Sequence, residues 1–241
     1  MTTIVIENKD TFVDDGELSA GASALDNFLQ NDFLPVWGSD AVVGMLAPFQ
    51  VRAANPSQPA TPTEWLLSLH LEVDRPRTYG YHDKTAAGLP WMRIFPAIAE
   101  NEGQTWEMAA AHELLETIVD PELDRWATLA DGRTIALEVC DAVQKIMVPR
   151  NGVKLSDFVI PAYFGFAGPM LRGALDCAGL VHAQGEMLTQ GYNQLRRGNR
   201  IEIIGDARAR ARLHRRGTRL WKRCLKNQPA FWRAIRCMTC Q

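Results

Sequence analysis

The sequence has no run of 18 consecutive apolar residues, and its first ten residues lack the basic and apolar regions of a secretory signal. We therefore expect no membrane-spanning helix, no export and no membrane partner. The chain has only 5 cysteines, and an odd number without a signal argues against a disulfide framework. It also lacks a G-x-S-x-G elbow, a phosphate-binding loop and a dinucleotide fingerprint, which argues against serine hydrolases, NTPases and dehydrogenases.

Charge is unevenly distributed along the 241 residues, although the net charge is only -2. From residue 191 onward there are 14 Arg or Lys against two acidic residues, about +12, which leaves the rest of the chain at about -14. Hydrophobic residues make up 46% of the chain, enough to bury a sizeable core. We therefore expect a folded domain over 1–190 and a basic C-terminal arm over 191–241.

Hydrophobic periodicity predicts the order strand, helix, three strands, helix. The expected ranges are a strand at 2–8, a helix at 17–37, strands at 41–49, 64–73 and 91–99, and a helix at 106–119. Pro96 suits an edge strand, and 75–90 is predicted to be a turn-rich connection. Farther on, 135–147 is predicted to be a short helix or strand and 157–164 a strand.

The most specific motif is HELLE, residues 112–116, on the helix that Thr105 is expected to cap and Pro121 to end. Residues four apart on a helix project side by side, so His112 and Glu116 can share one metal ion. This is the layout of the metalloprotease helix H-E-x-x-H, in which the intervening glutamate, here Glu113, is the general base. The alternative is an amphipathic helix whose charged residues have no catalytic role.

A catalytic zinc site needs three protein ligands and one open position. The third ligand would come from Asp120, where the helix ends, or from Glu138 or Asp141 in the segment that follows. Zinc accepts carboxylate oxygens, but two anionic ligands weaken the polarisation of water at the site.

Five segments, taken in order, resemble a family of tailed-phage and prophage proteins with a metallopeptidase-like helix. They are NDFLPVWGSDA (31–41), YGYHDKTAAGLPWMRIF (79–95), AAAHELLETIVDP (109–121), EVCDAV (138–143) and KLSDFVIPAYF (154–164). A more distant likeness joins the HELLE helix and the later acidic-x-x-Asp element to the plant phosphate-induced extracellular proteins.

The resemblance implies an α+β, zincin-like fold with a mixed twisted sheet and a zinc ion. It also implies that His112 and Glu116 are zinc ligands, that Glu113 is the base, and that the acidic residues at 120, 138 and 141 supply the third ligand or support the others. Location in a virion and in the host cytoplasm, and contact with other phage structural proteins, follow from the same resemblance.

Three aromatic or histidine side chains are further candidates near such a site. His82 lies in the predicted connection before the third strand and could reach a cleft. Tyr163 and Tyr192 could stabilise an oxyanion. For each of the three, a purely structural role is the simpler interpretation.

The basic arm mixes cationic and aromatic side chains, which suits either phosphate contacts with base stacking or docking on an acidic protein surface. The candidate binding residues are Arg208, Arg210, Arg212, Arg215, Arg216, Arg219, Trp221, Lys222 and Arg223. A homo-oligomer, in which the arm of one copy meets the acidic body of another, is compatible with this charge pattern.

Two functions follow from these observations. The first is a phage-encoded, zincin-like protein with a zinc-water site that hydrolyses peptide bonds. The second is a structural component of a head, neck or tail, with an inactive zincin-like fold and an arm that docks on protein or DNA.

Overall fold

The computed structural model describes residues 1–10, 12–38, 48–74, 78–168 and 170–205. Its helices are α1 (Asp15–Phe28), the π-helical turn η1 (Leu29–Phe33), α2 (Leu34–Trp37), α4 (Pro96–Asn101), α5 (Trp106–Val119) and the 3-10 turn η2 (Pro161–Phe164). Its strands are β1 (Thr2–Asn8), β2 (Phe49–Ala53), β3 (Trp65–Leu69), β4 (Gly80–Lys84), β5 (Pro90–Ile94), β6 (Trp126–Thr128), β7 (Thr134–Ala136), β8 (Met147–Arg150), β9 (Val153–Ser156), β10 (Tyr192–Arg197) and β11 (Arg200–Gly205). The expected α+β class is confirmed.

The largest sheet has the strand order β2-β1-β3-β5-β4. Its first four strands are parallel, whereas β4 runs antiparallel to β5 and forms one edge. The prediction that 91–99 is an edge strand was wrong, because β5 pairs on both sides and Pro96 instead starts α4. The prediction of a connection over 75–90 was also wrong in part, because it contains β4.

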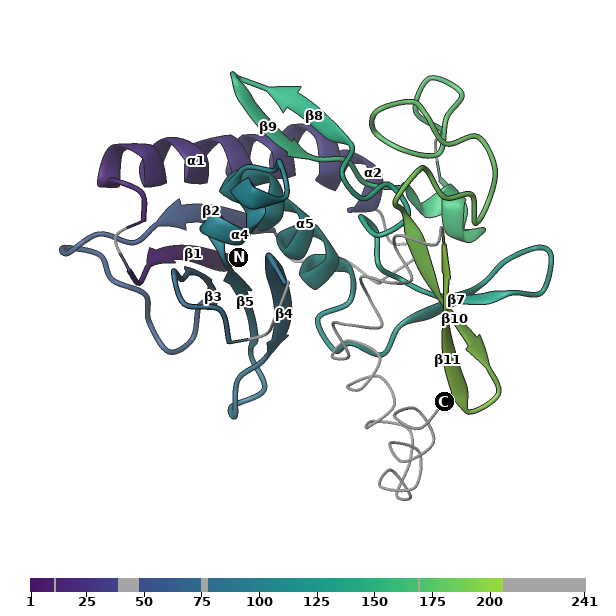
Figure 1. Ribbon diagram of the computed structural model, residues 1–241, viewed down its shortest axis with the longest axis horizontal. Helices are drawn as coiled ribbons and strands as arrows, with labels where there is room; N and C mark the ends of the chain where they lie inside the picture. Colours follow the sequence, from purple (N-terminus) through teal and green to yellow (C-terminus); the bar gives the residue numbers. More distant parts are fainter. Residues whose placement is uncertain (11, 39–47, 75–77, 169, 206–241) are drawn as a thin grey trace.

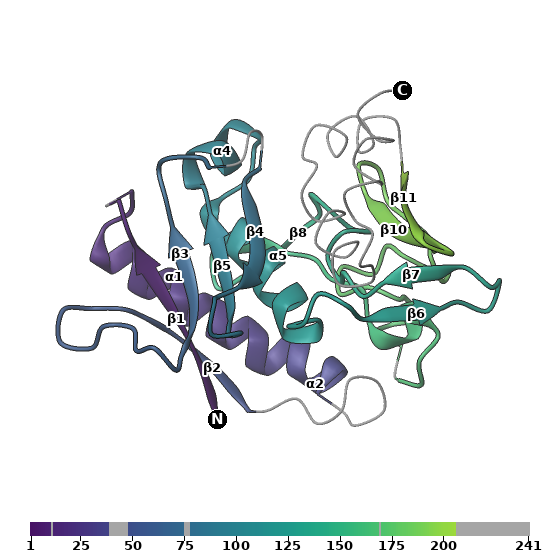
Figure 2. The ribbon, with the colours of Figure 1, turned by 90° about the horizontal axis from the view of Figure 1, so that it is seen from below.

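Two helices cover one face of this sheet. Figures 1 and 2 show α1 and α5 on the same side of the strands, with α5 next to β5 and β4. The apolar faces of both helices are buried against the sheet and against each other. Burial of these faces drives their packing, because removal of apolar surface from water stabilises the fold.

The helix predicted over 17–37 exists, but it begins at Asp15, because the side chain of Asp14 accepts a hydrogen bond from the backbone of Glu17. It continues through η1 into α2, with Gly38 as its C-cap. Trp37 at its end donates from Nε1 to the Val159 carbonyl at 3.0 Å, which fixes the helix to the later chain. The strand expected at 41–49 lies mostly outside the described residues.

A second sheet, ordered β11-β10-β7-β6, lies beyond the end of α5 (Figure 1), and the β8-β9 hairpin packs on α5. The described start of the predicted arm therefore belongs to a sheet, since β10 pairs with β7. The strand expected at 157–164 is not present; η2 occupies its second half. Within 135–147, β7 ends at Ala136 and turns follow. Those turns bring Cys140 close to His112 and Glu116 on α5.

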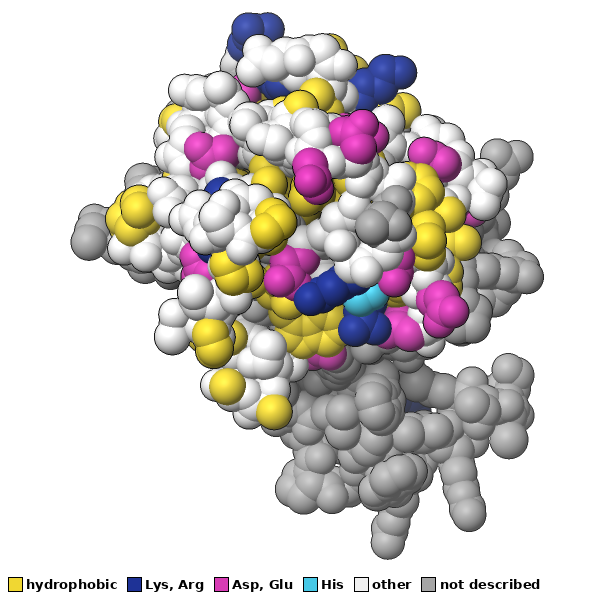
Figure 3. All heavy atoms as spheres, turned by 90° about the vertical axis from the view of Figure 1, so that its left-hand side faces the viewer, with side chains coloured by type: hydrophobic (Ala, Val, Ile, Leu, Met, Phe, Trp, Pro, Cys, Tyr) yellow, Lys and Arg dark blue, Asp and Glu magenta, His cyan; other side chains and the backbone are white. Residues whose placement is uncertain are grey.

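The acidic excess of the body is dispersed where the surface can be seen. Figure 3 shows acidic side chains scattered among hydrophobic and uncharged groups on one end of the molecule, without a continuous patch of one sign. Among the described residues, no helix is both long and apolar enough to cross a membrane.

Candidate metal centre

Helix α5 carries the HELLE motif with the bounds that the sequence predicts. Thr105 is its N-cap and accepts from the Met108 backbone at 3.2 Å, and the helix ends at Val119, two residues before Pro121. Its motif side chains are fully buried, since His112 is 2% exposed and Glu113 and Glu116 are 0% exposed. A charged surface helix is therefore excluded, and these groups need polar partners inside the protein.

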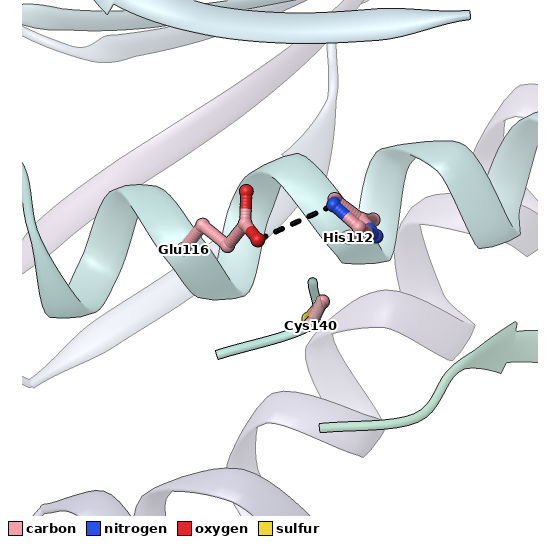
Figure 4. Close-up of side chains that lie close together, drawn as sticks. All are labelled: His112, Glu116 and Cys140. Atoms are coloured by element: carbon pink, nitrogen blue, oxygen red, sulfur yellow. Dashed lines mark ion pairs between the residues drawn. The ribbon is translucent and has the colours of Figure 1, made fainter. Parts of the chain in front are cut away.

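One group of potential ligands surrounds His112. Its Nε2 atom lies 3.3 Å from Glu116 Oε1, and Cys140 comes from the turns that follow β7 (Figure 4). The ligand atoms of His112, Glu116 and Cys140 all lie within 4.8 Å of one another. We refer to these three residues as the His112 group.

The spacing in the His112 group fits a zinc ion. Two ligands that are each about 2.0–2.2 Å from one ion at a tetrahedral angle lie about 3.4 Å apart. The observed separation of 3.3 Å between His112 and Glu116 agrees with that value. Imidazole, carboxylate and thiolate are also three of the donors that zinc uses.

A second group of potential ligands surrounds His82. The ligand atoms of His82, Glu116 and Glu138 lie within 4.8 Å of one another, and all three residues are buried. Glu138 Oε1 also accepts a hydrogen bond from Gln194 Nε2 at 3.2 Å, so β10 contributes to the site. We refer to these three residues as the His82 group.

His82 lies on β4 and not in a loop, contrary to the sequence prediction. In a strand, alternate side chains point to opposite faces, so Gly80 and His82 face α5 while Tyr81 faces the aromatic cluster with Trp91 and Phe95. Nδ1 of His82 lies 2.9 Å from Glu113 Oε2 and donates to that carboxylate. This hydrogen bond joins the edge strand to the motif helix.

Gly80 explains how β4 comes so close to the helix. A Cβ atom at this position would lie 3.0 Å from Glu113 Cγ and 3.2 Å from Glu113 Oε1. The glycine therefore leaves the space that the Glu113 side chain occupies.

The negative charges around His112 decide its protonation. Burial by itself disfavours the imidazolium, but the charge of Glu116 and the hydrogen bonds to Asp141 and Glu116 outweigh it and hold the pKa of His112 well above its ordinary value. Burial, with the nearby charge of Glu116, also raises the pKa of the Cys140 thiol well above its usual range. A bound cation would replace these protons, because metal ligands bind in their deprotonated form.

Three other predicted site residues, Asp141, Asp120 and Tyr163, differ in whether they approach these two groups. Asp141 Oδ1 is 3.5 Å from His112 Nε2, on the side of the imidazole that also faces Glu116. Asp120 belongs to neither group; its carboxylate accepts from the backbone of Asp124 and Arg125. Tyr163 donates to the Glu186 carbonyl and accepts from Asn193, neither of which is in the cluster.

Six candidates from the sequence lie together in the structure: His82, His112, Glu113, Glu116, Glu138 and Asp141. Cys140 was not among the candidates, yet its sulfur lies in the His112 group. Its position between Glu138 and Asp141 was the one signal that could have identified it. The proposed binding residues from Arg208 to Arg223 lie outside the described residues.

No protein-family model, curated protein or solved structure matches this chain.

Proposed function

We propose that this protein is a metal-dependent hydrolase of zincin type, with a zinc ion held by His112, Glu116 and Cys140, and that it acts on peptide bonds. One observation carries the proposal: an imidazole and a carboxylate one helical turn apart converge with a thiol, all buried, beside a second glutamate. The order of elements from β1 to α5 has the strand-helix-strands-helix sequence expected from the resemblance, with one additional strand, β4, and the short helix α4.

A zinc ion bound there would polarise a carbonyl and lower the pKa of a water molecule. The residues of the chain do the remaining work. Glu113 directly follows His112 on the helix. Its carboxylate would take the proton from water and pass it to the leaving amine. Its Oε2 atom is held by His82, so the orientation of the carboxylate is fixed before a substrate arrives.

The Asp141 carboxylate lies on the metal-binding side of His112. Its Oδ1 atom is 3.5 Å from Nε2, the same nitrogen that would bind the ion, and this separation is close to that of two ligands of one zinc ion. Asp141 is therefore the residue that would complete the site if Cys140 did not bind.

Burial of the site favours a second candidate function. Each of the six clustered side chains is at most 3% exposed, so a peptide could reach the centre only after a rearrangement. A structural component of a phage particle, in which a bound metal ion stabilises the fold without turnover, has no such requirement. The five segments that resemble tailed-phage proteins support a place in a particle for either function.

Metal analysis of the purified chain tests the proposal first. We expect at least one zinc ion per chain, and we expect His112→Ala and Glu116→Ala each to hold at least one zinc ion fewer than the wild type. Wild-type protein without metal after purification and zinc dialysis would end both the hydrolase proposal and the structural-metal alternative.

Turnover separates the two candidates. With a mixed peptide library as substrate, the wild type should cleave, and Glu113→Gln should keep at least one metal ion while cleavage falls by at least 100-fold, the scale of a lost general base. Zinc-loaded protein that cleaves no peptide would favour the structural function. His70→Ala is a matched control, because His70 lies at the end of β3 and contacts Ser68, outside the cluster.

A further inference from the structure

His82 presents its two ring nitrogens to different carboxylates. Because a carboxylate only accepts, the hydrogen bond at 2.9 Å to Glu113 places the proton of a neutral His82 on Nδ1. Its Nε2 atom then carries a lone pair, and this atom faces Glu138 Oε2 at 4.0 Å. A second proton on the ring or a metal ion between the two atoms removes the repulsion between this lone pair and the anionic oxygen.

The Glu113-His82 pair also has the form that supports a metal ligand. A metal-bound histidine usually donates its other N–H to a carboxylate, which fixes the tautomer. Here the donor is Nδ1 and the acceptor is Glu113, so Nε2 is the atom that can bind. Gln194 holds Glu138 in place through the other oxygen of that carboxylate.

Glu116 lies between the two histidines. Its Oε1 atom is 3.3 Å from His112 Nε2, and its Oε2 atom is 3.8 Å from His82 Nδ1. Glu116 is a member of both groups, so one carboxylate lies within reach of both sites. A carboxylate shared in this way is the bridge of a two-metal site, where the ions lie about 3.5–4 Å apart.

Charge balance favours two cations over one. Glu113, Glu116, Glu138 and Asp141 bring four negative charges into contact with two imidazoles in a buried region. With both imidazoles neutral and Cys140 bound as a thiolate, the side chains carry a charge of about -5, so one divalent ion leaves about -3 and two leave about -1. Buried charge that is not neutralised is costly, so the second cation is stabilised by the same carboxylates.

We propose that the His82 group is a second metal site, so that Glu116 bridges two divalent ions, one held with His112 and Cys140 and the other with His82 and Glu138. This proposal rests on the proposed metal-dependent function and extends it to a two-metal centre. A centre of this kind stabilises both the attacking and the leaving atoms of a hydrolysis.

The two sites differ in their donors. The His112 group includes a thiol, which selects zinc, whereas the His82 group offers one imidazole and two carboxylates, a set that also suits manganese. We therefore expect the His82 site to exchange its ion for Mn²⁺ while the His112 site retains zinc.

The test is a titration of the full, metal-stripped chain with Zn²⁺ and, separately, with Mn²⁺, with bound metal counted after gel filtration. We expect two zinc ions per wild-type chain, one in His82→Ala and one in His112→Ala, with two retained in His70→Ala. Manganese should occupy one site in the wild type and in His112→Ala and none in His82→Ala.

The outcomes separate the two proposals. One zinc ion in the wild type, unchanged in His82→Ala and lost in His112→Ala, overturns the second site and leaves the proposed function standing. A wild-type chain that binds no metal overturns both the second site and the proposed function. If His82→Ala does not fold, paramagnetic resonance of wild-type protein loaded with Co²⁺ decides: spin coupling between two bound ions supports a bridge, and two uncoupled ions or a single ion contradict it.

Discussion

His82 Nδ1 on the edge strand β4 lies 2.9 Å from Glu113 Oε2 on the motif helix α5. Both side chains are buried, with exposed fractions of 3% and 0%. This contact is the direct link between the sheet edge and the cluster, and it connects two segments that are 31 residues apart in the sequence. The stability of the metal-free protein should therefore depend on it.

We expect His82→Ala to lower the free energy of unfolding of metal-free protein by about 3 kcal/mol, the scale for removal of one partner of a buried pair. Denaturant titration in the presence of a chelator measures this change. His70→Ala is the control, because His70 is only half-buried and should cost about 1 kcal/mol through its lost hydrogen bond. Equal losses in the two variants would contradict a special role for the contact.

Gly80→Ala tests the close approach of β4 to α5. The added Cβ would lie 3.0 Å from both Glu113 Cγ and Ile94 Cδ1, so the neighbours must move. Overpacking of this kind costs about 1–3 kcal/mol. We expect that loss in thermal or chemical unfolding, with weaker metal binding at the His82 group because a displaced Glu113 no longer orients His82. Gly168→Ala, whose Cβ would meet Pro161 at an ordinary 3.5 Å, should change neither.

The sequence predicted local structure well where one element carries its own signals. The strand at 2–8 and the helix at 106–119 have the expected bounds, because the first is rich in β-branched residues and the second has its cap and its proline. The pairing of strands, in contrast, could not be predicted from such local signals. The position of β5 inside the sheet depends on contacts with β3 and β4, which no local pattern encodes.

The same difference separates the two candidate ligands on α5 from the other residues of the cluster. His112 and Glu116 were predictable because helical geometry alone brings them together. The roles of His82 and Cys140 depend on β4 and on the turns after β7, which approach α5 only in the folded chain. Asp120 was an equal candidate in the sequence, and only the structure gives it a different set of hydrogen bonds.

We expect Asp120→Ala to keep the metal content of the wild type. Its carboxylate accepts from the backbone of Asp124 at 3.0 Å and of Arg125 at 3.2 Å, so it stabilises the turn after α5. Loss of these bonds should lower stability by about 1–2 kcal/mol. Chemical denaturation and metal analysis of the same sample measure both effects. A drop of one metal ion per chain would instead make Asp120 a ligand.

A second buried pair, Asp157 and Asp176, should make stability depend on pH. Burial of the Asp157 carboxyl, with the hydrogen bond and negative charge of Asp176, raises its pKa from 3.8 to about 8. The folded protein therefore holds a proton that the unfolded chain releases. With respect to this group, stability is greatest below about pH 4, falls as the pH rises toward 8 and is constant above that value.

Asp157→Asn should remove this dependence, because an amide can donate to Asp176 at every pH. We expect the slope of unfolding free energy between pH 5 and 7 to become less negative by up to about 1.4 kcal/mol per pH unit, the value for one proton. Metal-free samples avoid a contribution from bound ions. Asp131→Asn is the control, since Asp131 is exposed and its pKa is lowered by hydrogen bonds to Arg133, so it should not alter the slope in that range.

The identity of the third ligand near His112 can be decided between neighbouring residues. Cys140 contributes a ligand atom to the His112 group, whereas Asp141 faces the imidazole at 3.5 Å. With Co²⁺ in place of zinc, the sulfur-to-cobalt charge-transfer absorption should therefore vanish in Cys140→Ser and persist in Asp141→Asn. Zinc affinity should fall in both, and by about 10–100-fold in Asp141→Asn, the scale for loss of a residue that supports a metal site. Cys177→Ser should leave both unchanged, because Cys177 lies beside Arg150 and outside both groups.

Persistence of the absorption in Cys140→Ser would remove Cys140 from the centre and leave Asp141 as the third ligand.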